Sequence, residues 1–173
     1  MRLLFLGMIA LILSACSAPH DKYVGYWKLE DSKQANILEI KKEDKDTYLV
    51  NENILRQMNS LGNKPKEMVL EKKEDQLAIN NKLMLIPLNL SSDGKTLRID
   101  TNKYTKISEA DAKTTLKNHT ACTELRTQFQ EEKKPFDGFF FGSRQNPNQD
   151  KLDAVKSKYT ELKSKIPECD FTI

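Results

Sequence analysis

Between residues 23 and 107, short apolar segments repeat with polar residues at every second position. Leu38 and Ile40, for example, share one face of their segment. An alternation with a period of two is typical of β-strands that bury one face. Clusters of turn-forming residues, such as 43–46 and 91–94, separate the segments. The pattern predicts strands at 23–30, 36–41, 47–51, 67–72, 76–79, 83–90, 96–100 and 103–107.

The regular spacing of these segments favours an antiparallel meander of about eight strands. Such a meander forms either a small barrel or a strongly curved sheet. The alternative is an open sheet covered by helices from the C-terminal region. Residues 53–65 are ambiguous, because Ile54, Leu55 and Met58 have helical spacing but the segment also fits a long loop.

After Ile107 the hydrophobic period becomes helical. Ser108 precedes Glu109 and Asp111, a pattern that predicts an N-cap with acids in the first helical turn. One face of this helix carries Leu116, His119, Cys122, Leu125 and Phe129. A second helix is predicted to begin near Asn146-Pro147. Its apolar stripe consists of Leu152, Val155, Tyr159, Leu162 and Ile166. The chain is therefore predicted to be an α+β protein, with a β-meander followed by a helical pair.

The N-terminus has the pattern of an export signal. A single Arg2 precedes the apolar run 3–13, which is too short to span a bilayer. The run ends in Leu13-Ser14-Ala15-Cys16, and this stretch resembles the lipobox of bacterial lipoproteins. The resemblance implies that the Cys16 thiol is acylated, that the chain is cut before it, and that the new N-terminus is acylated too. A soluble periplasmic protein with a free Cys16 is the alternative.

Ser17 stands where lipoproteins retained in the inner membrane commonly have Asp. The resemblance therefore implies an outer-membrane protein, anchored through its lipid and facing the periplasm or the cell surface. A tether as short as 17–22 reaches only about 20 Å, which places the folded part close to the membrane. The chain divides into a signal peptide (1–15), a tether (16–22), a β-domain (23–107) and a helical region (108–173).

The charge balance argues against a nucleic-acid partner. The whole chain has a net charge of +3, and loss of Arg2 with the signal lowers it by one unit. So mild an excess of basic residues does not make the strong positive field that nucleic-acid binding needs.

Cys122 and Cys169 form an even pair once Cys16 is assigned to lipid. Exported proteins occupy an oxidising compartment, so these two cysteines are predicted to form a disulfide. The alternative is a zinc site. His119 and Cys122 lie three residues apart on a helix and, with Cys169, would supply three ligands. Oxidation of the pair would remove that site, and we predict no metal and no cofactor.

Gly25-Tyr26-Trp27 lies at the head of the meander. This triplet resembles the Gly-x-Trp at the start of the first strand of lipocalins and related calycin-like barrels. The resemblance covers residues 23–107 and implies that Trp27 packs at the closed end of a barrel against a basic side chain from the last strands. Arg98 is the first candidate for that side chain, and Lys106 is the second.

The segment between the two predicted helices is rich in Phe, with Phe136 followed by Phe139, Phe140 and Phe141. These rings either pack on the β-domain or form a contact patch for a partner. Successive residues of an extended loop point to opposite sides, so at least one of Phe139, Phe140 and Phe141 is expected to remain exposed or half-covered, and these three are the predicted partner-binding residues.

The sequence contains no Gly-x-Ser-x-Gly elbow, phosphate-binding glycine loop or His-Glu-x-x-His motif. Of its two histidines, His20 falls in the tether and His119 on a buried helix face, where a packed and hydrogen-bonded imidazole is expected. Three lysine pairs either meet an anionic surface or are solvated by neighbouring acids. They are Lys41-Lys42, Lys72-Lys73 and Lys133-Lys134.

These observations predict a non-enzymatic binding or assembly protein of the cell envelope. Its partner would be an envelope protein or an apolar ligand. The alternative is an inhibitor or immunity-type protein that neutralises an enzyme or toxin directed at the envelope. That alternative is an analogy from the fold alone.

Overall fold

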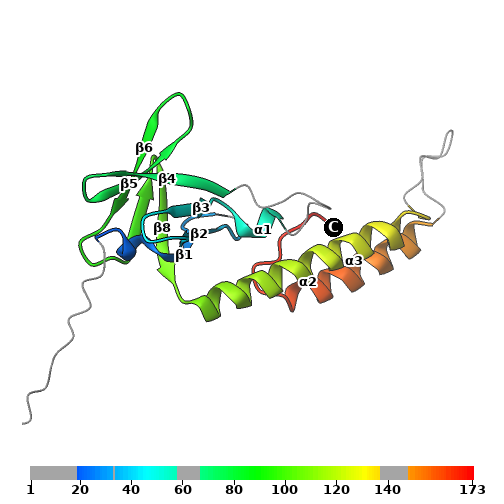
Figure 1. Cartoon of the computed structure of the whole chain (residues 1–173). Coiled ribbons are helices and arrows are strands. Elements are labelled where there is room, and N and C mark those ends of the chain that lie inside the picture. The colour runs from blue at the N-terminus through cyan, green and yellow to red at the C-terminus, as the bar shows by residue number, and fades with distance from the viewer. Residues whose placement is uncertain (1–18, 33, 58–66, 137–147) are drawn as a thin grey trace, which may run out of the picture.

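The computed structural model describes residues 19–32, 34–57, 67–136 and 148–173. Eight antiparallel strands follow one another around a closed barrel, and the last strand pairs with the first (Figure 1). The strands are β1 (Gly25–Leu29), β2 (Ile37–Lys42), β3 (Tyr48–Asn51), β4 (Glu67–Lys73), β5 (Gln76–Asn80), β6 (Leu85–Leu90), β7 (Thr96–Ile99) and β8 (Asn102–Ile107). The predicted meander is confirmed, and closure excludes the open sheet.

The barrel interior is filled by side chains. An eight-stranded barrel is just wide enough to be packed in this way. Inward-facing residues from every strand form one buried cluster. It contains Tyr23, Trp27, Leu38, Ile40, Tyr48, Val50, Leu70, Leu77, Ile79, Leu88, Leu97, Ile99 and Tyr104. The alternation seen in the sequence therefore places every second residue in this core.

One end of the barrel is closed by the segment that precedes β1. The short 3₁₀ helix η1 (Asp21–Tyr23) places the Tyr23 side chain in the core, where its hydroxyl donates to the Leu88 carbonyl at 3.2 Å. His20 is also buried, and its Nε2 lies 2.9 Å from the Glu74 carbonyl oxygen. The prediction of a tether through residue 22 was therefore wrong at its C-terminal end. Residues 20–22 belong to the folded barrel, because the His20 ring is buried there with its Nε2 beside the Glu74 carbonyl, and Asp21 and Lys22 form η1 with Tyr23.

A short helix, α1 (Ile54–Gln57), follows β3 and accounts for part of the ambiguous segment. Leu55 is fully buried and packs with Ile37 of β2. Residues 58–65 of that segment lie outside the described residues. Ala112, from the first long helix, completes this small cluster on the outer wall of the barrel.

That helix is α2 (Glu109–Lys133), and the predicted cap is confirmed: the Ser108 hydroxyl accepts from the Asp111 amide at 3.1 Å. After crossing the barrel wall, α2 extends beyond it beside α3 (Gln149–Ser164) (Figure 1). Helix α3 begins at Gln149, and its predicted start at 146–147 lies outside the described residues. Among the helices of the described residues, none combines the length and apolar character that crossing a bilayer requires.

The helical pair has its own core, formed by Leu125, Phe129, Val155, Tyr159 and Phe171. The predicted disulfide Cys122–Cys169 is present, with Cα atoms 5.4 Å apart. Because α2 is much longer than α3, the end of α3 lies beside the middle of α2 (Figure 1). The chain that follows α3 can therefore reach Cys122, although Cys122 lies midway along its helix.

Candidate functional site

The best-formed cavity that we describe is a groove along one face of α2, with a volume of about 420 Å³. Positions spaced three and four residues apart share a helix face, which explains how a single helix lines most of it. The α2 side consists of Thr115, Asn118, His119, Cys122, Thr123, Arg126, Thr127, Gln130 and Glu131. The loop before β2 contributes Gln34 and Ala35, and the C-terminal tail contributes Pro167, Glu168, Asp170 and Phe171. We call this cavity the α2 groove.

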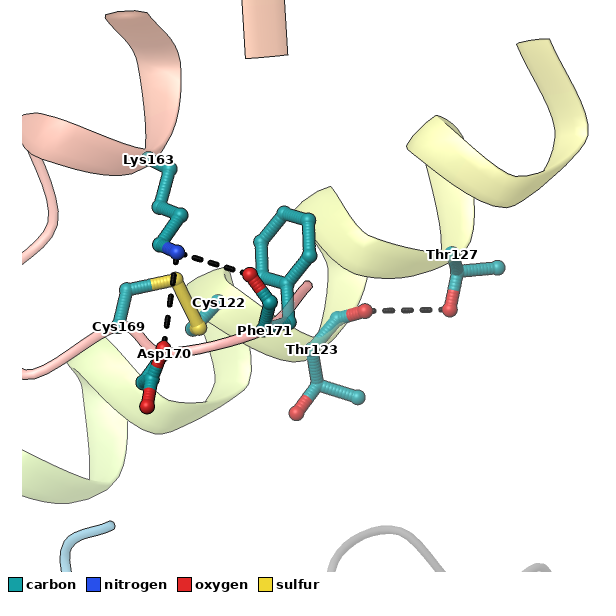
Figure 2. Close-up of a disulfide and its surroundings, with 7 residues drawn as sticks. All are labelled: Cys122, Thr123, Thr127, Lys163, Cys169, Asp170 and Phe171. Atoms are coloured by element: carbon teal, nitrogen blue, oxygen red, sulfur yellow. Dashed lines mark hydrogen bonds and ion pairs between the residues drawn. A yellow bond between two sulfur atoms is a disulfide. The ribbon is translucent and has the colours of Figure 1, made fainter. Parts of the chain in front are cut away.

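The tail side of the α2 groove is fixed at several points (Figure 2). The disulfide joins Cys169 to Cys122 on α2. Lys163 donates a 2.8 Å hydrogen bond to the Phe171 carbonyl and lies 3.6 Å from the Asp170 carboxylate. The Phe171 side chain is buried. The tail is therefore a fixed wall, which reduces the entropy that binding a ligand would cost.

An ion pair ties the same tail to the barrel. Lys28, on β1, contacts the Glu168 carboxylate. Both side chains are partly exposed, so the pair adds little stability. Its importance is geometric, because it joins the barrel end of the α2 groove to the tail.

His119 lies half-buried in the groove, as the sequence predicted for a packed and hydrogen-bonded imidazole. Burial lowers its pKa from the ordinary value of 6.5, and a hydrogen bond with the Leu55 backbone partly opposes that effect. A lowered pKa favours the neutral imidazole at neutral pH. His119 therefore offers the groove hydrogen-bonding capacity without a positive charge.

Arg126 supplies the positive charge. It is exposed and makes no ion pair within the part of the chain that the structure describes. A guanidinium presents several donors that match a carboxylate. Elsewhere in the α2 groove, Asn118, Gln130 and Thr127 add the amide and hydroxyl groups that pair with a peptide backbone. Glu131, Glu168 and Asp170 line the same groove, so the arrangement suits non-covalent binding of a polar, extended chain that carries groups of both charges.

The residues predicted to pack at the barrel end are only partly those found there. Trp27 is completely buried, and its Nε1 donates to the Tyr23 carbonyl at 2.9 Å. The cation over its ring is Lys106, with Nζ 5.0 Å from the ring centroid. Arg98, the first candidate, was wrong. It lies between the inward-facing Leu97 and Ile99 and therefore points outward into solvent.

Lys106 is held in place on both sides. Its Nζ donates to the Lys22 carbonyl at 3.1 Å, and its Cε lies close to Gly25. Burial lowers the pKa of this ammonium group, and the face of Trp27 compensates part of its lost hydration. The contact closes the barrel end, which is a structural role.

Other predicted site residues fall outside the described residues. These are the lipid-anchor residue Cys16 and the partner-binding Phe139, Phe140 and Phe141. Phe136, just before that segment, is described: it is partly buried and packs against the helical core.

The structure bears on two alternatives that the sequence left open, the zinc site and the role of the lysine pairs. The disulfide consumes both thiols of the zinc alternative, and among the described residues no cluster of ligands could hold a metal ion. Three of the paired lysines are neutralised by acids: Lys41 contacts Glu67, Lys42 contacts Asp21, and Lys72 contacts Asp46. For these three lysines, solvated surface ion pairs are therefore favoured over contact with an anionic surface.

Two features were missed in the sequence. The first is the α2 groove. Its polar residues have helical spacing, but the same spacing occurs on any solvated helix face and does not indicate a cavity. The other is an exposed apolar group on the β5–β6 hairpin, where Leu83 is 91% exposed. Its signal was the run Leu83-Met84-Leu85, which follows the turn-forming Asn80-Asn81 after Lys82.

Comparisons of the chain with protein-family profiles, with curated proteins and with solved structures found no match.

Proposed function

We propose that this protein is a lipid-anchored, non-enzymatic binding protein of the bacterial cell envelope. In this proposal Cys16 attaches it to the outer membrane, with the folded part in the periplasm, and the α2 groove binds an extended segment of an envelope protein. The observation that carries the binding site is the groove itself, where Arg126 stands without an ion pair among the described residues, beside hydrogen-bonding side chains.

A protein partner is favoured over an apolar ligand. The usual place for an apolar ligand in a small barrel is its interior. Here Trp27, Tyr48 and Leu88 are completely buried within the cluster that fills the interior. Most of the residues that line the groove outside the barrel have side chains that can hydrogen-bond to a polypeptide backbone, whereas an apolar ligand would leave these groups without partners.

The test begins with crosslinking in intact cells and identification of the captured protein. That protein is then purified, and its affinity is measured for the wild type, for Arg126→Glu and for a matched control, Arg98→Glu. Arg98 is exposed on the barrel and does not line the groove. A hydrogen bond to a charged group contributes about 1.5–3 kcal/mol. We therefore expect Arg126→Glu to weaken binding by roughly tenfold to a hundredfold.

Arg98→Glu should leave the affinity unchanged. Equal affinities for all three proteins would overturn the groove as the binding site. If the captured protein were instead a foreign enzyme whose activity falls on binding, the inhibitor function would replace the assembly role.

A further inference from the structure

The tip of the β5–β6 hairpin exposes large apolar side chains in a well-ordered turn. Leu83, Met84 and Leu85 are 91%, 62% and 45% exposed. The Asn81 side chain accepts hydrogen bonds from the Leu83 amide at 3.0 Å and from the Met84 amide at 2.8 Å. The turn therefore holds these side chains in solvent, at the cost of hydrating them. We call Leu83, Met84 and Leu85 the hairpin tip.

These side chains leave the hairpin in different directions. Leu85 pairs with Asn80 on the outer face of the barrel, whereas the next residue, Ile86, pairs with the inward-facing Ile79. Successive residues of a strand alternate in this way, so Met84 and Leu85 point to opposite sides. A flat protein surface would contact only one side of such a tip. A bilayer surrounds a protruding tip and covers all of its sides.

The position of the hairpin tip also points to a membrane. His20, where the described chain begins to pack, bonds to Glu74 in the turn between β4 and β5. Strand β5, about 17 Å long, connects this turn to the hairpin tip. With Cys16 four residues before His20, the tether spans at most about 14 Å. A barrel tilted with its β4–β6 wall toward the membrane and the hairpin tip lowermost would bring both the anchor and the tip to one surface.

We propose that the hairpin tip inserts among the acyl chains of the bilayer that holds the lipid anchor. Lys82, beside the tip, would then lie at the phosphate headgroups. Helix α2 packs on the opposite wall, near β1 and β2, so the helical pair and the α2 groove face away from the membrane (Figure 1). The inference rests on the proposed anchor, because the anchor brings the tip to the bilayer.

The test uses the full-length protein, purified with its lipid and reconstituted into vesicles of phosphatidylethanolamine and phosphatidylglycerol. Leu83→Cys is labelled with a thiol-reactive environment-sensitive fluorophore. Ser157→Cys on α3 is the matched control, since both positions are exposed. Lipids with nitroxide groups on their acyl chains quench a fluorophore that lies in the hydrocarbon region. We expect quenching of at least about half the signal and a blue shift at residue 83, with neither at residue 157.

Equal, water-like emission and no quenching at both positions would overturn the insertion. A crosslink from residue 83 to a protein, in cells, would overturn it in favour of a protein contact. Failure of the anchor is a separate result: the unlabelled wild-type protein would then not float with the vesicles. Leu83→Asp, at a position without packing contacts to lose, should float as the wild type does but leave a label at residue 85 unquenched.

Discussion

At the residue scale, the closed end of the barrel depends on Gly25. Its φ of +134° lies in a region that residues with a Cβ rarely adopt, and an added Cβ would meet Lys106 Cε at 3.2 Å. We expect Gly25→Ala to lower the free energy of unfolding by about 1–3 kcal/mol. Gly94→Ala is the control, because Gly94 has a φ of +68° but nothing within 4 Å of the new methyl group.

Chemical denaturation of both variants, followed by the fluorescence of the single tryptophan, measures the difference. Gly94→Ala should cost less, since it adds backbone strain without a close contact. Equal losses would show that the Lys106 contact contributes nothing.

His119 makes stability depend on pH. Its folded pKa is lowered below 6.5 by burial, so the unfolded chain binds a proton more readily than the folded chain. The contribution of the neutral imidazole is therefore complete above about pH 6.5 and is lost as the pH falls from there through the folded pKa. We therefore expect the free energy of unfolding to decline as the pH falls below about 6.5.

In His119→Gln the decline in the free energy of unfolding with falling pH should be smaller. The difference between the wild-type and variant profiles gives the contribution of His119 separately from that of the carboxylates. Denaturation curves at several pH values measure it. A wild type and a variant with parallel pH profiles would contradict the assignment.

The choice between Arg98 and Lys106 as the cation over Trp27 shows what could be predicted for single residues. The resemblance correctly indicated a cation for Trp27, but the first choice ignored the strand alternation. Leu97 and Ile99 face the core, which forces Arg98 outward, whereas Lys106 shares its face with the inward Tyr104. The sequence contained the information needed to choose Lys106. By contrast, nothing in it indicated that His20 would be buried, because that depends on the distant Glu74 carbonyl.

At the scale of elements, the disulfide holds the C-terminal tail against α2. It closes a separation of 47 residues, for which the chain-entropy estimate is roughly 4 kcal/mol as an upper figure. We expect Cys122→Ala with Cys169→Ala to lower the free energy of unfolding by about 2–4 kcal/mol. Thermal denaturation by circular dichroism measures the helical pair, while Trp27 fluorescence reports the barrel.

The helical signal should shift to lower temperature by more than the Trp27 signal, because the disulfide lies wholly within the helical region. Identical shifts would show that the barrel and the helical pair unfold as one unit. An unchanged helical transition would contradict the stabilising role.

Strand and helix positions were predictable because each depends on a local period. Closure of the barrel was not, since the pairing of Tyr26 with Ile107 depends on the accumulated twist of all the strands. The α2 groove was also beyond prediction. Its helical face becomes a cavity only when the tail at Phe171 is placed beside it.

At the scale of the whole molecule, the barrel and the helical pair meet through a small cluster around Ile37, Leu55 and Ala112. The Lys28–Glu168 ion pair adds a second connection. The described chain begins at one end of the barrel, where His20 bonds to Glu74, and α2 extends away from the barrel wall with the α2 groove along one of its faces (Figure 1). This order of parts suits a protein that is held at a surface and presents a site to a partner.

The orientation of the whole molecule depends on the proposed lipid anchor at Cys16. Replacing Cys16 removes the only thiol of the Leu13-Ser14-Ala15-Cys16 motif, so Cys16→Ser should abolish acylation and leave the protein soluble or unprocessed. Mass spectrometry of the mature wild type should show a lipid increment on Cys16, and fractionation should place the protein with the outer membrane. The Cys122–Cys169 disulfide should form in both proteins and confirm that export is intact. A wild-type protein in the soluble fraction without added mass would exclude the anchor, and the folded chain would then be a free periplasmic protein.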